Sequence, residues 1–175
     1  MKYLVVSDIH GSYDSAQIIE KKFIENKCDK IIILGDILYH GPRNDLPESY
    51  NPKKVIEILN KYSDKIIAVQ GNCDAEVDQM VLKFKIYLGY YLEINHQKYY
   101  LTHGHHINYL MPKNFNEKMI ILHGHTHIIR KDIVNGDIYF NIGSITMPKE
   151  NTEKCYGILE DTFKIYNLND ELLLE

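Results

Sequence analysis

YLVVSDIHG, at residues 3–11, sets a pattern that the rest of the chain repeats. Residues 3–7 are a short apolar run, which predicts a buried strand, and the carboxylate of Asp8 follows at its end. His10 lies two positions further on, so both side chains can turn toward one point. Carboxylate oxygen and imidazole nitrogen together form a ligand set suited to Mn, Fe or Zn. An Asp-x-His pair alone more often marks a surface loop, so its meaning depends on the other segments.

The same arrangement of a buried strand followed by a polar residue recurs twice along the chain. Residues 30–34 (KIIIL) predict a second buried strand, which ends at Asp36, and residues 65–69 (KIIAV) predict a third, which ends before Asn72. Strands that alternate with helices predict a parallel sheet, and ligands bind at the carboxyl ends of such strands. We therefore expect the three polar side chains to meet at one edge of the sheet.

The remaining segments complete the predicted fold. They are helices at residues 14–27 and 53–62, a proline-containing loop at 37–52, antiparallel strands within 86–102, a buried strand at 119–123, a hairpin at 128–142 around Asn135-Gly136, and a final hairpin of 155–160 with 163–168. Together they predict an α/β fold, an αββα sandwich of two packed mixed β-sheets flanked by helices. No linker or repeat interrupts the chain, so residues 1–175 are expected to form a single domain.

Six of the nine histidines fall in two short clusters, at residues 103–106 and 123–127. His103 follows a strand in LTHGHH, and His125 and His127 follow another in HGHTH. A single histidine is usually a satisfied core residue or a surface residue. Two histidines in Gly-His-x-His at a strand end, together with the acidic loops, predict metal ligands instead. Closed structural zinc sites are usually rich in thiolates, and the three cysteines here have no such spacing.

Composition excludes several classes of function. A net charge of −4 gives no basic signal for nucleic acid or for an anionic membrane surface. Three irregularly spaced cysteines do not suggest a disulfide framework. The N-terminal apolar run is too short for a signal peptide, and no stretch approaches the ~20 apolar residues of a membrane span. We expect a cytoplasmic protein, and the tyrosine-rich segment 87–100 leaves a homo-oligomer possible in principle.

The ordered blocks DIH, GD, GNCD, THGH and GHTH resemble the calcineurin-like metallophosphoesterase superfamily, from Asp8 to His127 and on to NIGS at Asn141. The segments GNCD, GDILYHGPRN and FNIGSITMPK look most like its YfcE-type phosphodiesterases. The resemblance implies the αββα sandwich, a small phosphodiester substrate and a hydroxide that bridges two divalent metal ions. We expect Mn²⁺ first, and the ligand set also suits Zn²⁺, Fe²⁺, Ni²⁺ or Mg²⁺. The implied ligands are Asp8, His10, Asp36 and His127 for one ion, and Asp36, Asn72, His103 and His125 for the other.

Cys73 departs from the pattern of this family, in which many members have His after the Asn ligand. A thiol does not place a positive charge there, which favours diesters or activated esters over monoesters with poor leaving groups. The candidate catalytic residues are Cys73, Asp74, which would orient a ligand histidine, and His40, which could supply the missing acid. Arg43 and His105 are candidate substrate contacts, Arg43 because a guanidinium suits phosphate. For Cys73 and Arg43, a purely structural role is an equal alternative.

Two other functions remain as alternatives on the same fold. One is a non-catalytic metal-binding interaction scaffold, and the other is a nuclease that acts on long nucleic acid. All seven ligand positions hold competent residue types, which disfavours the scaffold. The nuclease lacks a basic surface signal. We therefore predict a metal-dependent phosphodiesterase.

Overall fold

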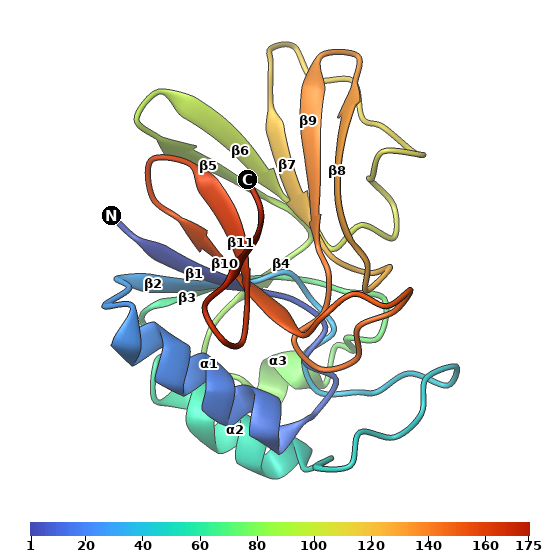
Figure 1. The fold of residues 1–175 in the computed structure, drawn as a ribbon. Coiled ribbons are helices and arrows are strands. Elements are labelled where there is room, and N and C mark those ends of the chain that lie inside the picture. Colours follow the sequence, from blue (N-terminus) through green and yellow to red (C-terminus); the bar gives the residue numbers. More distant parts are fainter.

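The computed structural model describes residues 1–175, which form two packed β-sheets and a layer of helices (Figure 1). The strands of the first sheet are Tyr3–Val6 (β1), Lys30–Ile33 (β2), Ile66–Val69 (β3), Ile86–Tyr87 (β4), Cys155–Leu159 (β10), Phe163–Asn167 (β11) and Leu172–Leu174 (β12). The strands of the second sheet are Tyr90–Ile94 (β5), Gln97–Leu101 (β6), Ile120–His123 (β7), Ile129–Val134 (β8) and Asp137–Ile142 (β9). The helices are Tyr13–Glu25 (α1), Pro52–Asn60 (α2) and Asp78–Val81 (α3).

Both sheets contain parallel and antiparallel strands. The first has the spatial order β12-β11-β10-β1-β2-β3-β4, in which β1 to β4 are parallel and β10 to β12 extend the sheet in antiparallel pairs. The second has the order β5-β6-β7-β9-β8, with parallel β6, β7 and β9 between two antiparallel edge strands. The predicted α/β class with two packed mixed sheets is therefore confirmed.

Alternate residues of β1 serve two different hydrophobic cores, because successive side chains of a strand point to opposite faces. Leu4 and Val6 pack in the core beneath the helices, whereas Tyr3 and Val5 pack in the core between the two sheets. A strand that is buried on both faces reads as a continuous apolar run, as residues 3–7 do. This double burial fixes β1 and the loop that follows it.

Side-chain caps set the start of both long helices. The Ser12 hydroxyl accepts a hydrogen bond from the Ser15 N–H at the start of α1, and Asn51 caps α2 in the same way through Lys54. The helices lie on one side of the first sheet (Figure 1). The longest of them has 13 residues, and none combines the length and apolar character needed to cross a membrane.

The expected αββα sandwich has its helices on one side only. The outer face of the second sheet is covered by the irregular segment 104–118, whose Ile107, Tyr109 and Phe115 pack on a small core around Ile121 and Tyr139. This segment makes the crossover between the parallel strands β6 and β7, a connection that is usually a helix. Its sequence lacks the apolar spacing of a helix, which accounts for the irregular layer.

Residues 86–102 differ from the expected run of antiparallel strands. Ile86 and Tyr87 form β4, which pairs in parallel with β3 in the first sheet, and only β5 and β6 form the expected antiparallel pair. The chain passes from one sheet to the other at Gly89, where a β-carbon would collide with the Tyr100 side chain. The predicted hairpin around Asn135-Gly136 is present, with both residues at positive φ, as a tight hairpin turn requires. The final hairpin of β10 and β11 is also present.

Candidate metal centre

All seven predicted metal ligands lie in loops that follow the carboxyl ends of strands. Asp8 and His10 follow β1, Asp36 follows β2, Asn72 follows β3, His103 follows β6, and His125 and His127 follow β7. The first two loops are joined directly, since the Asp8 N–H donates to Gly35 O at 3.1 Å and the His10 N–H to Asp36 O at 2.9 Å. Loops from both sheets thus meet at one end of the sandwich, as expected for parallel strands.

Five of these residues have a left-handed backbone conformation. The φ angles are 58° at Asp8, 50° at His10, 56° at Asp36, 73° at His125 and 63° at His127. Side chains other than glycine adopt this region infrequently, at a cost of order 1–3 kcal/mol each, and such residues cluster at functional sites. The sharp turns aim the side chains inward rather than along the strands.

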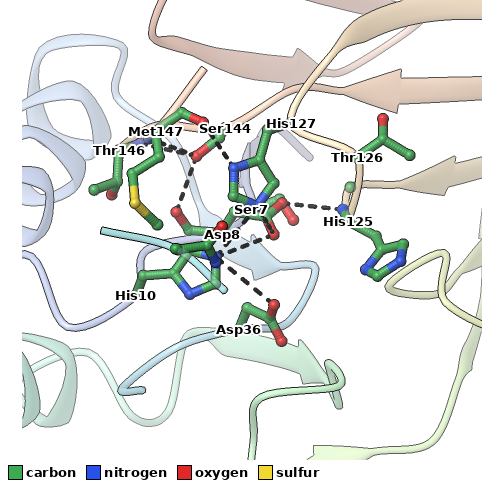
Figure 2. Close-up of polar contacts among 12 residues, drawn as sticks. Ser7, Asp8, His10, Asp36, His125, Thr126, His127, Ser144, Thr146 and Met147 are labelled. Carbon is green, nitrogen blue, oxygen red and sulfur yellow. Dashed lines mark hydrogen bonds and ion pairs between the residues drawn. The ribbon is translucent and has the colours of Figure 1, made fainter. Parts of the chain in front are cut away.

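Asp8, His10 and His127 form one buried group of donor atoms (Figure 2). The Nε2 atoms of His127 and His10 lie 3.1 Å and 3.5 Å from Asp8 Oδ1, and 3.3 Å from each other. On the far side of each ring, Nδ1 faces a backbone carbonyl oxygen, Tyr39 O at 2.9 Å for His10 and Met147 O at 2.7 Å for His127. A carbonyl oxygen only accepts, so each Nδ1 carries the proton and each Nε2 of the neutral ring presents a lone pair.

Asp36, His103 and Asn72 form the adjoining group. His103 Nδ1 donates to Leu34 O at 2.6 Å, so its Nε2 faces Asp36 Oδ2 at 3.3 Å and Asn72 Oδ1 at 3.1 Å. Asp36 Oδ2 also lies 3.7 Å from His10 Nε2. This one carboxylate oxygen therefore lies between the two groups of donor atoms.

The donor atoms of both groups fit divalent cations. Asp8 Oδ1 is buried without a hydrogen-bond donor, and the lone pairs of His10 and His127 face each other, an arrangement that a cation between them would stabilise. Burial alone would raise the pKa of Asp8, but the adjacent rings of His10 and His127 hold it well below its ordinary value. Burial alone would lower the pKa of His103, but its hydrogen bond with Asp36 and the nearby carboxylates raise it to about 9. The lowered pKa of Asp8 and the raised pKa of His103 both show that a positive charge is stabilised beside the carboxylates.

His125 is placed differently from the other histidines. Its backbone N–H donates to Asp8 Oδ2 at 3.1 Å, whereas its ring points away from Asp8 (Figure 2). The ring centroid lies 5.1 Å from that of His103, and the residue lines the cleft outside the groups of converging donor atoms. The structure thus brings six of the predicted ligands into direct contact and leaves the His125 ring at the rim.

A cleft of about 740 Å³ opens above these residues. Cys73 and Arg43 line it, together with Tyr39 and Lys149. The Cys73 N–H donates to Asp36 Oδ1 at 2.8 Å, and the thiol lies among the donor atoms of His10 and Asp36. Burial, and then the negative charge of Asp36, raises the pKa of the Cys73 thiol to about 12, so the thiol is neutral.

Two predicted site residues lie outside the cleft lining. The ring of His40 packs edge-on against Tyr39 and Tyr50, at centroid distances of 4.8 Å and 5.4 Å. The ring of His105 packs against the rings of His106 and of the predicted metal ligand His103, at centroid distances of 4.0 Å and 5.4 Å. Roles for His40 as an acid and for His105 in substrate contact stay predictions, and this placement gives them no direct support.

The comparisons with known proteins agree with this geometry. A family model described as a calcineurin-like phosphoesterase superfamily domain matches residues 1–162. The chain belongs to this superfamily. It is 40% identical over 179 residues to the phosphodiesterase YfcE of Escherichia coli K12, in an alignment that covers 99% of this chain and 96% of YfcE. It is 28% identical over 167 residues to the probable metallophosphoesterase YsnB of Bacillus subtilis, across 91% of this chain and 83% of YsnB. The solved structure of YfcE, a phosphoesterase from E. coli, superposes with a TM-score of 0.93 at 38% identity, over 99% of this chain and 97% of YfcE.

The sequence led us to expect that Asp74 orients a ligand histidine, and this expectation is wrong. Asp74 supports the phosphoesterase site by binding backbone N–H groups instead. Its carboxylate accepts the N–H groups of Asp36 at 2.9 Å, Ile37 at 2.7 Å and Gly71 at 2.7 Å. Burial raises the pKa of Asp74, although these three donors act in the opposite direction. The carboxylate thereby ties the loop that carries Asp36 to the loop that carries Asn72. Gly71 is required here, because a β-carbon would overlap Asp36.

Asp74→Asn is expected to loosen the two loops. The substitution turns an NH₂ group toward backbone N–H donors, and a buried donor left without an acceptor costs about 1–3 kcal/mol. We expect a melting temperature lower by about 3–8 °C and metal affinity reduced about tenfold, as is typical when a group behind a ligand is altered. Thermal denaturation and titration with Mn²⁺ would measure both. Asp45→Asn, at an exposed carboxylate, is the control; equal effects at both positions would contradict this role.

Ser144 also supports the site, in the NIGS segment of the sequence. Its hydroxyl donates to Asp8 O at 3.1 Å and accepts the N–H groups of Thr146 and Met147 (Figure 2). It thereby fixes the turn whose carbonyl at Met147 orients His127. Sequence reasoning did not assign Ser144, Tyr39, Leu34 or Met147 to the site. Three of these act through backbone carbonyls, which any residue supplies, so side-chain identity gives no signal.

Proposed function

We propose that the protein is a metal-dependent phosphodiesterase with two divalent ions, of which Mn²⁺ is our first candidate. Asp8, His10 and His127 would hold one ion, and Asn72, His103 and His125 the other, with Asp36 between them. The observation that carries the proposal is that three buried imidazole rings, each with its Nδ1 held by a backbone carbonyl, turn their Nε2 atoms toward two carboxylates. The 40% identity to a protein named as a phosphodiesterase supports the diester specificity.

The bound ions would lower the pKa of a water molecule toward ~7, which makes hydroxide available as a nucleophile at neutral pH. The residues of the chain hold and orient the reactants. Three backbone carbonyls fix the tautomers of His10, His103 and His127, so the donor atoms are organised before substrate arrives. Arg43 lines the cleft without an acidic partner, and its guanidinium suits a two-point contact with the scissile phosphate.

Cys73 favours diesters as substrates. Monoesters carry more negative charge than diesters, and a poor leaving group needs a proton as its bond to phosphorus breaks. The raised pKa of Cys73 leaves a neutral thiol, which brings no positive charge to the cleft. A diester with a stable leaving group needs neither form of assistance to the same degree.

Hydrolysis of bis(p-nitrophenyl) phosphate and p-nitrophenyl phosphate, with Mn²⁺, Mg²⁺, Zn²⁺ or no added metal, tests the proposal. We expect diester hydrolysis that needs metal, is fastest with Mn²⁺ and is lost with a chelator. Activity that survives complete chelation would contradict the metal mechanism. Tight metal binding without hydrolysis of either ester would favour the interaction scaffold instead.

Arg43→Ala is expected to lower kcat/KM for the diester about tenfold, because a charge-assisted hydrogen bond contributes about 1.5–3 kcal/mol. Arg43→Lys should recover only part of the loss, since an ammonium lacks the planar fork of a guanidinium. Steady-state kinetics with metal-saturated protein would measure the effect. An unchanged kcat/KM in Arg43→Ala would leave this residue with a structural role in its loop.

A further inference from the structure

Two cationic side chains line the cleft without acidic partners. Arg43 comes from the loop between β2 and α2, and Lys149 from the loop between β9 and β10. Neither takes part in an ion pair. The acidic residues of the lining are Asp36, which lies among the metal-ligand groups, and Asp74, whose oxygens accept backbone N–H groups. Both cations are therefore free to bind an anion from solution.

Lys149 has a backbone held by hydrogen bonds and an ammonium group without an acidic partner. Its N–H donates to His127 O at 3.0 Å, and its own carbonyl accepts the N–H of Thr152 at 3.0 Å. The exposed side chain has one polar contact, between Nζ and Asn44 Oδ1 at 3.5 Å. Asn44 is itself oriented, because its amide donates to His40 O at 2.8 Å. The loops on the two walls thus meet where Lys149 contacts Asn44. Lys149 is itself hydrogen-bonded through its backbone to the predicted metal ligand His127.

The charge of the cleft exceeds what a simple diester needs. Two divalent ions with Asp8, Asp36 and a hydroxide leave about one positive charge, which one phosphodiester anion balances. Arg43 and Lys149 add two further positive charges to the walls, of which the Asp74 carboxylate offsets at most one, so at least one positive charge is in surplus. An ammonium that is not paired with a carboxylate binds phosphate well as a point charge. The surplus charge therefore fits a substrate with more than one anionic group.

We propose that Lys149, with Asn44 beside it, forms a second anion subsite, and that the substrate is a phosphodiester with an additional phosphate or carboxylate group on one ester arm. The scissile phosphate lies at the metal centre beside Arg43, and the second anion lies at Lys149. This inference rests on the proposed phosphodiesterase function and names the substrate class for it. Lys149 is a specificity residue and takes no part in bond cleavage.

Two chromogenic diesters with the same leaving group test this subsite. They are the p-nitrophenyl esters of thymidine 5′-phosphate, with and without a phosphate at the 3′ oxygen. We expect the wild-type protein to prefer the form with the additional phosphate by about tenfold in kcat/KM, as one charge-assisted contact provides. In Lys149→Met, which removes the ammonium group and keeps an unbranched side chain only one atom shorter, the ratio of the two kcat/KM values should fall to near one. Lys154→Met, at an exposed lysine outside the cleft lining, should keep the wild-type ratio.

Binding supplies a second readout that does not depend on turnover. Calorimetry with Mn²⁺-loaded protein should show that thymidine 3′,5′-bisphosphate binds more tightly than thymidine 5′-phosphate, and that Lys149→Met removes the difference. If wild-type protein hydrolyses bis(p-nitrophenyl) phosphate but shows no preference in either assay, the second subsite is wrong and the phosphodiesterase stands. If Lys149→Met lowers both diesters equally, Lys149 contacts the scissile phosphate and the subsite is again wrong. If no diester is hydrolysed under any metal, the proposed function fails, and the inference about its substrate fails with it.

Discussion

Asp36→Ala is expected to lower kcat/KM for bis(p-nitrophenyl) phosphate by on the order of 10³-fold, which corresponds to about 4 kcal/mol of lost transition-state stabilisation. The reason is the position of this carboxylate. Asp36 Oδ2 lies 3.3 Å from His103 Nε2 and 3.7 Å from His10 Nε2, so it alone contacts histidines of both donor groups. Its other oxygen accepts the Cys73 N–H at 2.8 Å, which links it to the loop after β3. Removal of Asp36 is therefore expected to affect both proposed ions together.

The measurement combines kinetics with metal analysis of the purified variant. We expect at most one ion to remain bound, whereas loss of a ligand to one ion only, as in His127→Ala, should leave the second ion in place. Asp45→Ala, which removes an exposed carboxylate from the loop after β2, is the matched control and should retain both activity and metal content. Diester hydrolysis that persists at near wild-type rate in Asp36→Ala would exclude the dinuclear centre.

The convergence of the ligands could be predicted because it follows from sheet geometry. Apolar runs at residues 3–7, 30–34 and 65–69 each end before a polar residue, and parallel strands bring their carboxyl ends to one edge. The family resemblance then indicated how the donors divide between two ions. The ligands that follow β1, β2 and β3 could therefore be predicted from the local sequence, because each of these strands has a ligand in the loop after its end.

The interactions that orient the ligands could not be predicted in the same way. Asp74 binds three backbone N–H groups rather than a histidine, and the imidazoles are held by carbonyls of Leu34, Tyr39 and Met147. Backbone groups are the same in every residue, so the sequence alone does not show which of them reaches a ligand. Lys149 is the last residue of the segment FNIGSITMPK, but its side chain was not assigned to the site, because its proximity results from how the loop between β9 and β10 folds, which the local sequence does not show.

Cys73→His is expected to raise the turnover of phosphomonoesters with poor leaving groups, such as phenyl phosphate, by about 10²-fold. Proton transfer from a positioned acid typically contributes 10²–10⁴-fold, and an imidazole with a pKa near 6.5 can donate at neutral pH, whereas the Cys73 thiol is neutral with a pKa of about 12. The new ring would follow Asn72 on a backbone that the hydrogen bond from residue 73 to Asp36 already fixes. A β-carbon at Gly41 would lie 2.8 Å from Cys73 Sγ, so the ring has no room on that side and must point into the cleft.

The leaving group separates proton donation from a general improvement of the site. Phenolate needs a proton more than p-nitrophenolate does, so the gain for phenyl phosphate should exceed the gain for p-nitrophenyl phosphate. Cys73→Ser, which keeps the size of the side chain without adding an acid, should show neither gain. The rate for phenyl phosphate in Cys73→His should also decline as pH rises through the pKa of the new imidazole, because only its protonated form donates. If Cys73→His and Cys73→Ser behave alike with every ester, residue 73 only fills space, and the neutral thiol is not the cause of a preference for diesters.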